Sequence, residues 1–293
     1  FTQKGKCFWM RVYEIPEGTK VSKGRAIQNL INIEQDDKVK AFICTQDLKD
    51  EEYINNHYVI MATKKGQVKK TSLEQYSRPR TNGINAITIK EDDELLEAKL
   101  TNGDSQVMIA LKSGKAIRFE EAKTRPMGRG ASGVRGVRLQ NDLDEAIGMI
   151  AVNEMDSDIL VVSENGYGKR SSLEDYRITN RGGKGVKTIS ITEKTGALVA
   201  IKNVSDNDDL MIINKSGIAI RLAVENLRVM GRATQGVKLI NLKTNDSIAA
   251  VAKVMHEEDE EIANETAVNE ALMDNTDNQT SEPKSNESTN KNE

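Results

Sequence analysis

A short pattern occurs five times along this sequence, and the repetition constrains the fold more than any other feature. In each copy after the first, a run of apolar residues leads to a turn that contains a glycine, and basic residues follow. The turn glycines are spaced by 61, 48, 52 and 51 residues, so the first copy carries an insertion. These anchoring glycines are Gly5, Gly66, Gly114, Gly166 and Gly217.

The later copies each begin like a β-hairpin. An apolar run such as Ile159-Leu160-Val161-Val162 is too short for a helix. A dipeptide such as Asn165-Gly166 or Ser113-Gly114 follows, and such dipeptides between apolar runs are typical of hairpin turns. Further strands are expected in alternating or apolar stretches at 134–139, 186–191, 237–242, 146–150 and 197–201. Four strands per copy predict an all-β, propeller-like ring of four-stranded antiparallel blades.

The repeat also predicts the domain organisation. We expect one domain over residues 1–256, because the loops keep the same register from copy to copy. Two separate β-sandwiches are the less favoured alternative. The expected blades cover approximately residues 1–56, 57–104, 105–155, 156–206 and 207–256.

The net charge of −3 conceals an uneven distribution. Residues 257–293 carry twelve acidic and two basic side chains, a net charge of −10, which leaves +7 for residues 1–256. A basic body indicates a polyanionic partner, although an excess of this size also occurs on enzyme surfaces. The acidic segment has too few apolar residues to offset its chain entropy, so we expect a disordered tail.

The most informative loop is Arg181-Gly182-Gly183-Lys184-Gly185. Its glycines allow the backbone to approach an anion closely, and its two cations would neutralise a phosphate. In isolation such a loop is more often a solvated turn, but similar loops recur at the same place in other copies. An arginine lies 15 residues after the anchoring glycine in three copies and 14 after it in the second, and a glycine lies at position 19 in the same three. The arginines are Arg80, Arg129, Arg181 and Arg232, and the glycines are Gly133, Gly185 and Gly236.

If each blade holds its loop at the same radius, the cations form one basic stripe around the rim. Such a stripe would follow the backbone of double-stranded DNA without reading its sequence, because phosphate contacts carry no base information. The predicted DNA-binding residues are Arg181, Gly182, Gly183, Lys184, Gly185, Lys187, Arg129, Arg135, Arg138, Arg232, Lys238, Arg80, Arg78, Lys169 and Arg170.

No pattern of catalytic, cofactor-binding or metal-binding residues accompanies the loops. Residues 128–133 fit G-x-G-x-x-G, but an alternating stretch follows where a dinucleotide site needs a helix. His57 and His256 lack partners at metal-ligand spacing. Cys7 and Cys44 fit no disulfide framework, and no apolar run approaches the roughly 18 residues of a membrane span. We therefore expect a cytoplasmic protein without a membrane partner, and no activity, cofactor or metal in this stretch.

The repeated motifs resemble the C-terminal domain of the DNA gyrase A subunit. The resemblance extends from Phe1 to about Met255 and rests on NGYGKRSSLEDY and NRGGKGVKTI within 165–189, MGRGASGVRGVRL at 127–139 and MGRATQGVKLINL at 230–242. It implies a β-pinwheel whose neighbouring blades exchange strands and whose rim wraps DNA. It also implies partners, namely the remainder of the A subunit together with the B subunit, in an ATP- and Mg-dependent type II topoisomerase that introduces negative supercoils into the chromosome.

The family's hallmark is a seven-residue box, Q-[RK]-R-G-G-K-G, of which residues 179–185 keep five positions while Thr179 and Asn180 depart from it. The chain begins at what resembles the second blade. The blade that usually carries the box, and the catalytic tyrosine domain, would then precede Phe1. Whether residues 181–185 are the wrapping box or a secondary contact therefore stays open. The alternatives are the topoisomerase IV A subunit, whose ring is similar but more degenerate, and a β-propeller scaffold for protein interactions.

Overall fold

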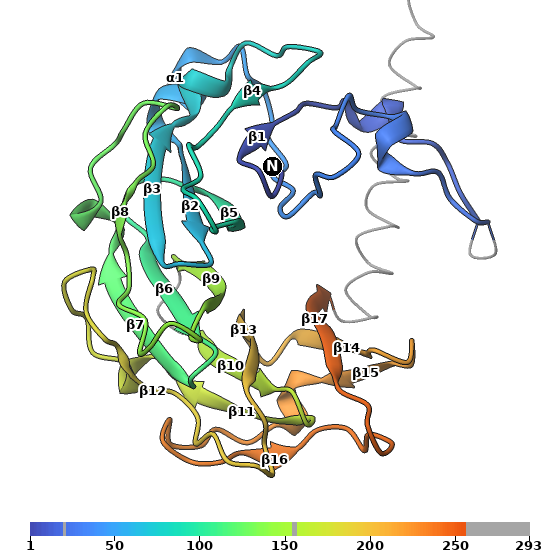
Figure 1. Ribbon diagram of the computed structural model, residues 1–293, viewed down its shortest axis with the longest axis vertical. Helices are drawn as coiled ribbons and strands as arrows, with labels where there is room; N and C mark the ends of the chain where they lie inside the picture. The colour runs from blue at the N-terminus through green and yellow to red at the C-terminus, as the bar shows by residue number, and fades with distance from the viewer. Residues whose placement is uncertain (20–21, 154–156, 256–293) are drawn as a thin grey trace, which may run out of the picture.

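The computed structural model describes residues 1–19, 22–153 and 157–255, and its regular structure is almost entirely antiparallel β-sheet. The sheets follow one another in an arc (Figure 1), which confirms the all-β, propeller-like fold. The predicted acidic tail, 257–293, lies outside the described residues. Among the described residues, no helix is long and apolar enough to cross a membrane.

Three sheets contain four strands in the same order. In each, the predicted hairpin forms the two central strands, a later strand of the same repeat lies toward the inside of the arc, and the outer strand comes from the next repeat (Figure 1). The first sheet is β5 (Leu95–Thr101), β2 (Tyr58–Thr63), β3 (Gln67–Ser72) and β8 (Val134–Arg135). The second is β9 (Ala146–Val152), β6 (Gln106–Leu111), β7 (Lys115–Glu120) and β12 (Val186–Lys187). The third is β13 (Leu198–Val204), β10 (Asp158–Ser163), β11 (Tyr167–Ser172) and β16 (Val237–Lys238).

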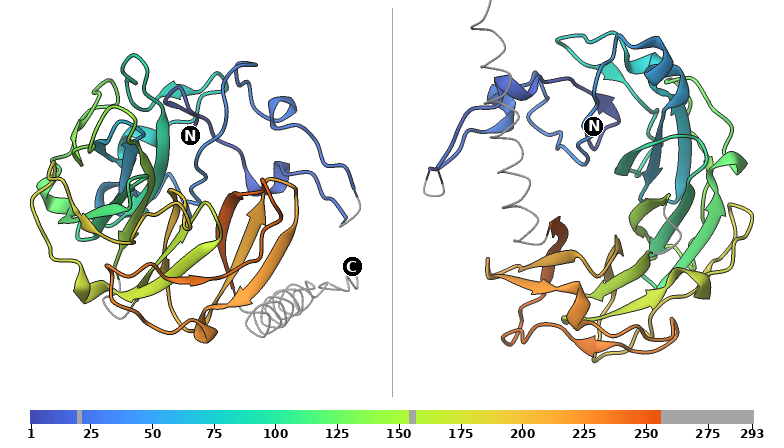
Figure 2. Two further views of the ribbon diagram at one scale, coloured as in Figure 1. Left: turned by 60° about the horizontal axis from the view of Figure 1, so that its bottom comes forward. Right: turned by 180° about the vertical axis from the view of Figure 1, so that it is seen from behind.

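The sheets at the two ends of the arc are smaller (Figure 2). The last contains only β17 (Ile248–Met255), β14 (Asp208–Asn214) and β15 (Ala219–Ala223). At the other end, β1 (Lys6–Cys7) pairs with β4 (Ile84–Asn85) alone. Because every outer strand is donated by the following repeat, no described segment is placed to cover β15. The repeats therefore do not each form a complete blade, and sheets cross the expected blade boundaries.

The remaining elements are short. A short α-helix, α1 (Glu51–Asn56), precedes β2, and its N-cap residue Asp50 accepts a hydrogen bond from the backbone N–H of Tyr53. The sequence analysis predicted no helical turns. The single-turn 3₁₀ segments are η1 (Val12–Glu14), η2 (Ile27–Asn29), η3 (Leu73–Tyr76), η4 (Glu121–Lys123), η5 (Leu173–Asp175) and η6 (Val224–Asn226).

The anchoring glycines end the hairpin turns, as predicted. Gly66 has a φ of +78°, a conformation that favours glycine. A Cβ at this position would lie 2.9 Å from the carbonyl oxygen of Val137, so the turn also needs the small size of glycine. The carbonyl of Gly66 accepts hydrogen bonds from the N–H groups of Gly136 and Val137, which draws the chain out of the sheet after β8. Only the first two residues of each stretch predicted as a strand at 134–139, 186–191 and 237–242 are therefore paired as a strand.

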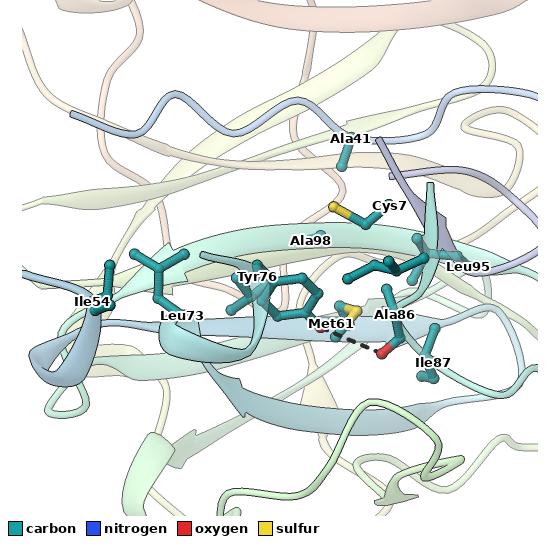
Figure 3. Packing of buried hydrophobic residues seen from close by; sticks show 12 residues of the cluster. Cys7, Ala41, Ile54, Met61, Leu73, Tyr76, Ala86, Ile87, Leu95 and Ala98 are labelled. Atoms are coloured by element: carbon teal, nitrogen blue, oxygen red, sulfur yellow. Dashed lines mark hydrogen bonds between the residues drawn. The ribbon is translucent and has the colours of Figure 1, made fainter. Parts of the chain in front are cut away.

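Apolar side chains pack between successive sheets. Ile159 and Val161 of β10 belong to one cluster, with Ile150 of β9, whereas Leu160 and Val162 belong to the next. Both faces of a blade are therefore covered, which explains why the central strands are continuously apolar. Figure 3 shows the N-terminal cluster, where Cys7 lies among residues of the second repeat.

Candidate nucleic-acid interface

Four loops lie along the outer side of the arc, each immediately before a donated strand (Figure 1). We call residues 77–83, 127–133, 179–185 and 230–236 the rim loops. Each begins after a 3₁₀ turn and ends in a glycine with positive φ, and the strand that follows pairs with the sheet of the preceding repeat. Strand exchange therefore places every rim loop at the same position relative to two neighbouring sheets.

Backbone hydrogen bonds join the segment after each donated strand to the next rim loop. The N–H of Thr88, just past the first loop, donates to the carbonyl oxygen of Ala131 in the second at 3.2 Å. The same contact recurs from Arg138 to Gly183, at 2.9 Å, and from Ser190 to Thr234, at 3.1 Å. The rim loops and the segments that follow the donated strands therefore form one connected strip.

The closing glycines let each loop lie against the preceding sheet. Gly185 has a φ of +71°, and a Cβ there would lie 2.6 Å from the carbonyl oxygen of Ala116. Gly83 holds the same place before β4, with a φ of +67°. Gly83 was not predicted from the spacing of the other glycines, because this repeat is two residues shorter between its glycines. Arg80 consequently lies three residues before its glycine, whereas Arg129 lies four before its own.

Two rim arginines connect their loops to backbone carbonyls of the neighbouring repeat, in β8, η4 and β12. Arg181 Nη1 donates to the carbonyl oxygen of Arg135 at 3.1 Å, and its Nε donates to that of Lys123 at 3.0 Å. Arg232 Nη1 makes the matching contact with the carbonyl of Lys187, at 2.7 Å. Since a guanidinium has about five N–H donors, these arginines can hold the rim together and still donate outward.

Most of the predicted DNA-binding cations are exposed on this strip, while the rim arginines Arg129, Arg181 and Arg232 are half-buried. The exposed ones are Arg78, Arg80, Arg135, Arg138, Lys184, Lys187 and Lys238.

Three further exposed arginines, which were not among the predicted DNA-binding residues, lie four residues before the rim arginines. They are Arg125, Arg177 and Arg228. The repeat held the signal, because each lies 11 residues after its anchoring glycine.

Lys169 and Arg170 do not belong to the exposed rim, in contrast to the prediction. Lys169 is 1% exposed and Arg170 is 8% exposed. Arg170 forms ion pairs with Asp158 and Asp206, with Nε 2.5 Å from Asp158 Oδ2, and its Nη1 also donates to the carbonyl oxygen of Val224. Both side chains lie in the middle of β11, where neighbouring blades cover the two faces of the sheet. They connect repeats and are not accessible to a duplex.

Sequence comparison identifies relatives over nearly all the described chain. A family model described as "DNA gyrase C-terminal domain, beta-propeller" matches residues 1–46, 57–102, 107–153, 157–205 and 208–255. The DNA gyrase A subunit of Staphylococcus epidermidis is 43% identical over 260 residues, and that of Staphylococcus aureus is 42% identical over 262. These alignments cover 88% and 89% of this chain but 29% of each relative. The chain thus spans under a third of the length of the curated relatives.

The solved structures that resemble this chain are also C-terminal domains of DNA topoisomerase IV and DNA gyrase. The C-terminal domain of DNA topoisomerase IV superposes with a TM-score of 0.78 at 25% identity, covering 88% of this chain and 78% of that one. A DNA gyrase A C-terminal domain superposes with a TM-score of 0.74 at 25% identity, covering 87% and 80%.

Proposed function

Because the chain belongs to the DNA gyrase C-terminal domain family, we propose that it binds double-stranded DNA without sequence specificity and wraps it along the rim loops. The observation that carries this proposal is the connected strip: the later rim loops are hydrogen-bonded to the segment that follows the preceding donated strand, and the strip presents cations to solvent along its length. A curved strip of evenly repeated cations suits a phosphate backbone, which repeats its charge at regular intervals.

Affinity in this proposal comes from release of counterions. Exposed side chains such as Lys184, Lys187 and Lys238 replace the counterions of the phosphates. The affinity therefore falls steeply as the salt concentration rises. Arg181 and Arg232 hold their loops in position and offer their remaining donors to phosphate oxygens. The glycines of 181–185 keep the backbone close enough for its N–H groups to contribute.

The wider proposal places the domain in DNA gyrase, where its partners are the remainder of the A subunit together with the B subunit. The curated relatives, which are named as the A subunits of DNA gyrases, support this assignment at 42–43% identity. The complete enzyme would use ATP and Mg²⁺ and supply strand passage, while wrapping at the rim would set the sign of supercoiling. The activity would take place in the cytoplasm, on the chromosome. Among the described residues, no group of three or more His, Cys, Asp and Glu side chains could hold a metal ion.

The topoisomerase IV A subunit is the second candidate, because its C-terminal domain superposes with a TM-score of 0.78. The two structural neighbours have the same 25% identity to this chain and do not separate the candidates. The higher identity to curated gyrase sequences favours gyrase. Under the remaining alternative, a protein-interaction scaffold, duplex binding should be weak and insensitive to salt.

Duplex binding at several salt concentrations tests the proposal. Replacing Arg181 and Lys184 by Ala should weaken binding by about 1–3 kcal/mol and lower the salt slope by about two units. Lys184→Ala alone separates charge from structure, because its side chain is exposed whereas that of Arg181 also holds the neighbouring strand β8. Lys99→Ala is the matched control, since Lys99 lies on the inner strand β5. A salt slope unchanged in both rim variants would contradict the proposal.

Hydroxyl-radical footprinting tests wrapping as distinct from binding. A duplex that follows the rim should show protection over a length spanning several loops, repeating with the helical period of roughly 10 base pairs. Protection limited to one short segment would support contact by a single loop and exclude a continuous path.

A further inference from the structure

A buried lysine lies directly beneath the rim loop 127–133. Lys69 in β3 follows its anchoring glycine by three residues, and its side chain is fully shielded from solvent. Its Nζ donates to the carbonyl oxygens of Ala86, at 2.5 Å, and Arg129, at 2.6 Å. The hydroxyl of Tyr76 donates to the same Ala86 carbonyl, along the dashed line of Figure 3. The ammonium therefore ties the backbone of a rim arginine to the core.

The same arrangement recurs two repeats later. Lys169 in β11 also follows its anchoring glycine by three residues. Its Nζ donates to the carbonyl oxygen of Gly231 at 2.7 Å and approaches Oγ1 of Thr234 at 3.3 Å. Both acceptors belong to the rim loop 230–236, which carries Arg232.

The repeat architecture does not by itself require an ammonium group at this position. The four acceptors of the two ammonium groups are uncharged oxygens, and a buried cation without a counter-charge is costly. Ile117 occupies the equivalent position in β7 and is 1% exposed, so the same architecture accepts an apolar side chain there. The two lysines therefore require an explanation beyond packing.

The distribution of charge among the rim loops explains why these two positions are lysines. The loop above Ile117 carries Lys184, whereas the loops above the two buried lysines have Ser132 and Gln235 at the corresponding position. Each of these three rim loops thus combines one arginine with one lysine, which lies either on the loop or directly beneath it. A lysine beneath the loop thus replaces the charge of a lysine on the loop, as expected if DNA binding depends on the positive charge at the rim.

We propose that Lys69 and Lys169 are positioning residues of the DNA-binding rim: protonated, they hold loops 127–133 and 230–236 and add positive charge to them, and a bound phosphate backbone favours that protonated state. This inference rests on the proposed function. The lysines act through the loops and need not touch the duplex.

The charge on both lysines is adjustable near neutral pH. Burial lowers the pKa of Lys69 to about 8, with Arg129 contributing in the same direction. Burial likewise lowers the pKa of Lys169 to about 8, where Arg232 and Lys187 lower it further and Asp175 opposes them. A phosphate next to either loop would raise these values, so binding takes up protons. The added affinity is complete below about pH 8 and is lost as the pH rises through the pKa of the bound state.

The tyrosines and the cysteine near the lysines stay neutral over this range. Burial raises the pKa of Tyr76 and that of Cys7, the latter to about 12, so both are neutral near pH 8. Beside Lys169, burial raises the pKa of Tyr176, whose hydroxyl is hydrogen-bonded to Thr188.

The test compares duplex affinity at about pH 7 and about pH 9, at constant salt, for the unchanged chain and the double variant Lys69→Met with Lys169→Met. The unchanged chain should lose affinity at least about threefold more than the double variant over this interval. Ile117→Met is the matched control, because it changes the same position beneath a loop that has no buried lysine; it should retain the full pH dependence. Circular dichroism without DNA verifies that each variant is folded.

Three outcomes separate the hypotheses. A steep, salt-dependent affinity with the same pH dependence in the unchanged chain and the double variant would overturn this inference and leave the proposed function intact. Absence of salt-dependent duplex binding by the unchanged chain at about pH 7 would overturn both. A flat pH profile in the double variant alone would support the inference.

A second measurement needs no folded variant. Calorimetric titration of the unchanged chain with duplex at about pH 8, in buffers of different ionisation enthalpy, reports protons taken up on binding. Carbon-13 shifts of the lysine side chains, followed against pH with and without duplex, assign the uptake. Zero uptake, with lysine titration curves that do not move on binding, would overturn the inference even if the double variant fails to fold.

Discussion

Lys70 and Glu121 form a buried ion pair between two consecutive repeats, with Nζ 2.9 Å from Oε1 and the glutamate side chain fully shielded from solvent. The hydroxyl of Thr101 and the N–H of Ser105 also donate to this carboxylate, at 2.7 and 3.3 Å. Lys70 further lies over the ring of Tyr58, 4.1 Å from its centre. One contact therefore joins the strand before a rim loop to the 3₁₀ turn of the next repeat.

Replacing Glu121 by Ala should lower the free energy of unfolding by about 3–5 kcal/mol, because Lys70 would remain buried without its partner. Urea denaturation measures the change. Glu120→Ala is the matched control: this neighbouring glutamate pairs with Lys123 at the surface, 3.7 Å apart, and its loss should cost less than about 1 kcal/mol. Equal costs for the two variants would contradict a structural role for the buried pair.

Replacement by alanine should reduce the stability of the chain strongly at Gly185 and only slightly at Gly130. At Gly185 the positive φ costs about 1–2 kcal/mol for any other residue, and the added Cβ would meet the carbonyl oxygen of Ala116 at 2.6 Å. At Gly130 no atom lies within 4 Å of an added Cβ. Gly185→Ala should therefore destabilise the chain by at least about 2 kcal/mol and Gly130→Ala by no more than about 0.5 kcal/mol. Thermal unfolding of both variants measures the difference in stability. If Gly185→Ala were as stable as the unchanged chain, β12 would not need to lie close to β7.

The two cysteines should differ sharply in reactivity. Cys7 is 4% exposed, and burial raises its pKa to about 12, so at neutral pH it is a shielded thiol. Cys44 is exposed. A chromogenic disulfide reagent should therefore modify one thiol per folded chain and two after denaturation. Cys44→Ser should remove the fast reaction; a fast reaction that survives this change would show that the N-terminal strand β1 opens readily.

The acidic residues 257–293 should weaken duplex binding at low salt. Their net charge of −10 is tethered to a body of net +7, so they compete with DNA for the same cations at high effective concentration. Screening over about 8–10 Å should reduce this competition as salt rises. Truncation after His256 should therefore increase affinity more at low than at moderate ionic strength. Identical affinities at low salt would reject competition by the tail.

The sequence by itself determined the repeat, its hairpins and the loops of the rim. These features depend on local chemistry: a glycine at positive φ closes each turn, as at Gly66 and Gly166, and short apolar runs supply the central strands. The same period located the rim arginines, and it contained Arg125, Arg177 and Arg228 as well. The gyrase family resemblance, which follows from these motifs, is confirmed by the match over five segments.

Only the tertiary structure decided where each strand pairs and which cations reach solvent. Alternation along a strand separates its two faces but does not show what covers each face. The sequence therefore predicted Lys169 and Arg170 to be surface cations, although neighbouring blades bury them. The donated strand β12 pairs with β7, about 70 residues earlier in the chain, and no local signal encodes a partner at that distance. Burial and strand exchange arise from contacts between repeats, and a single repeat does not contain them.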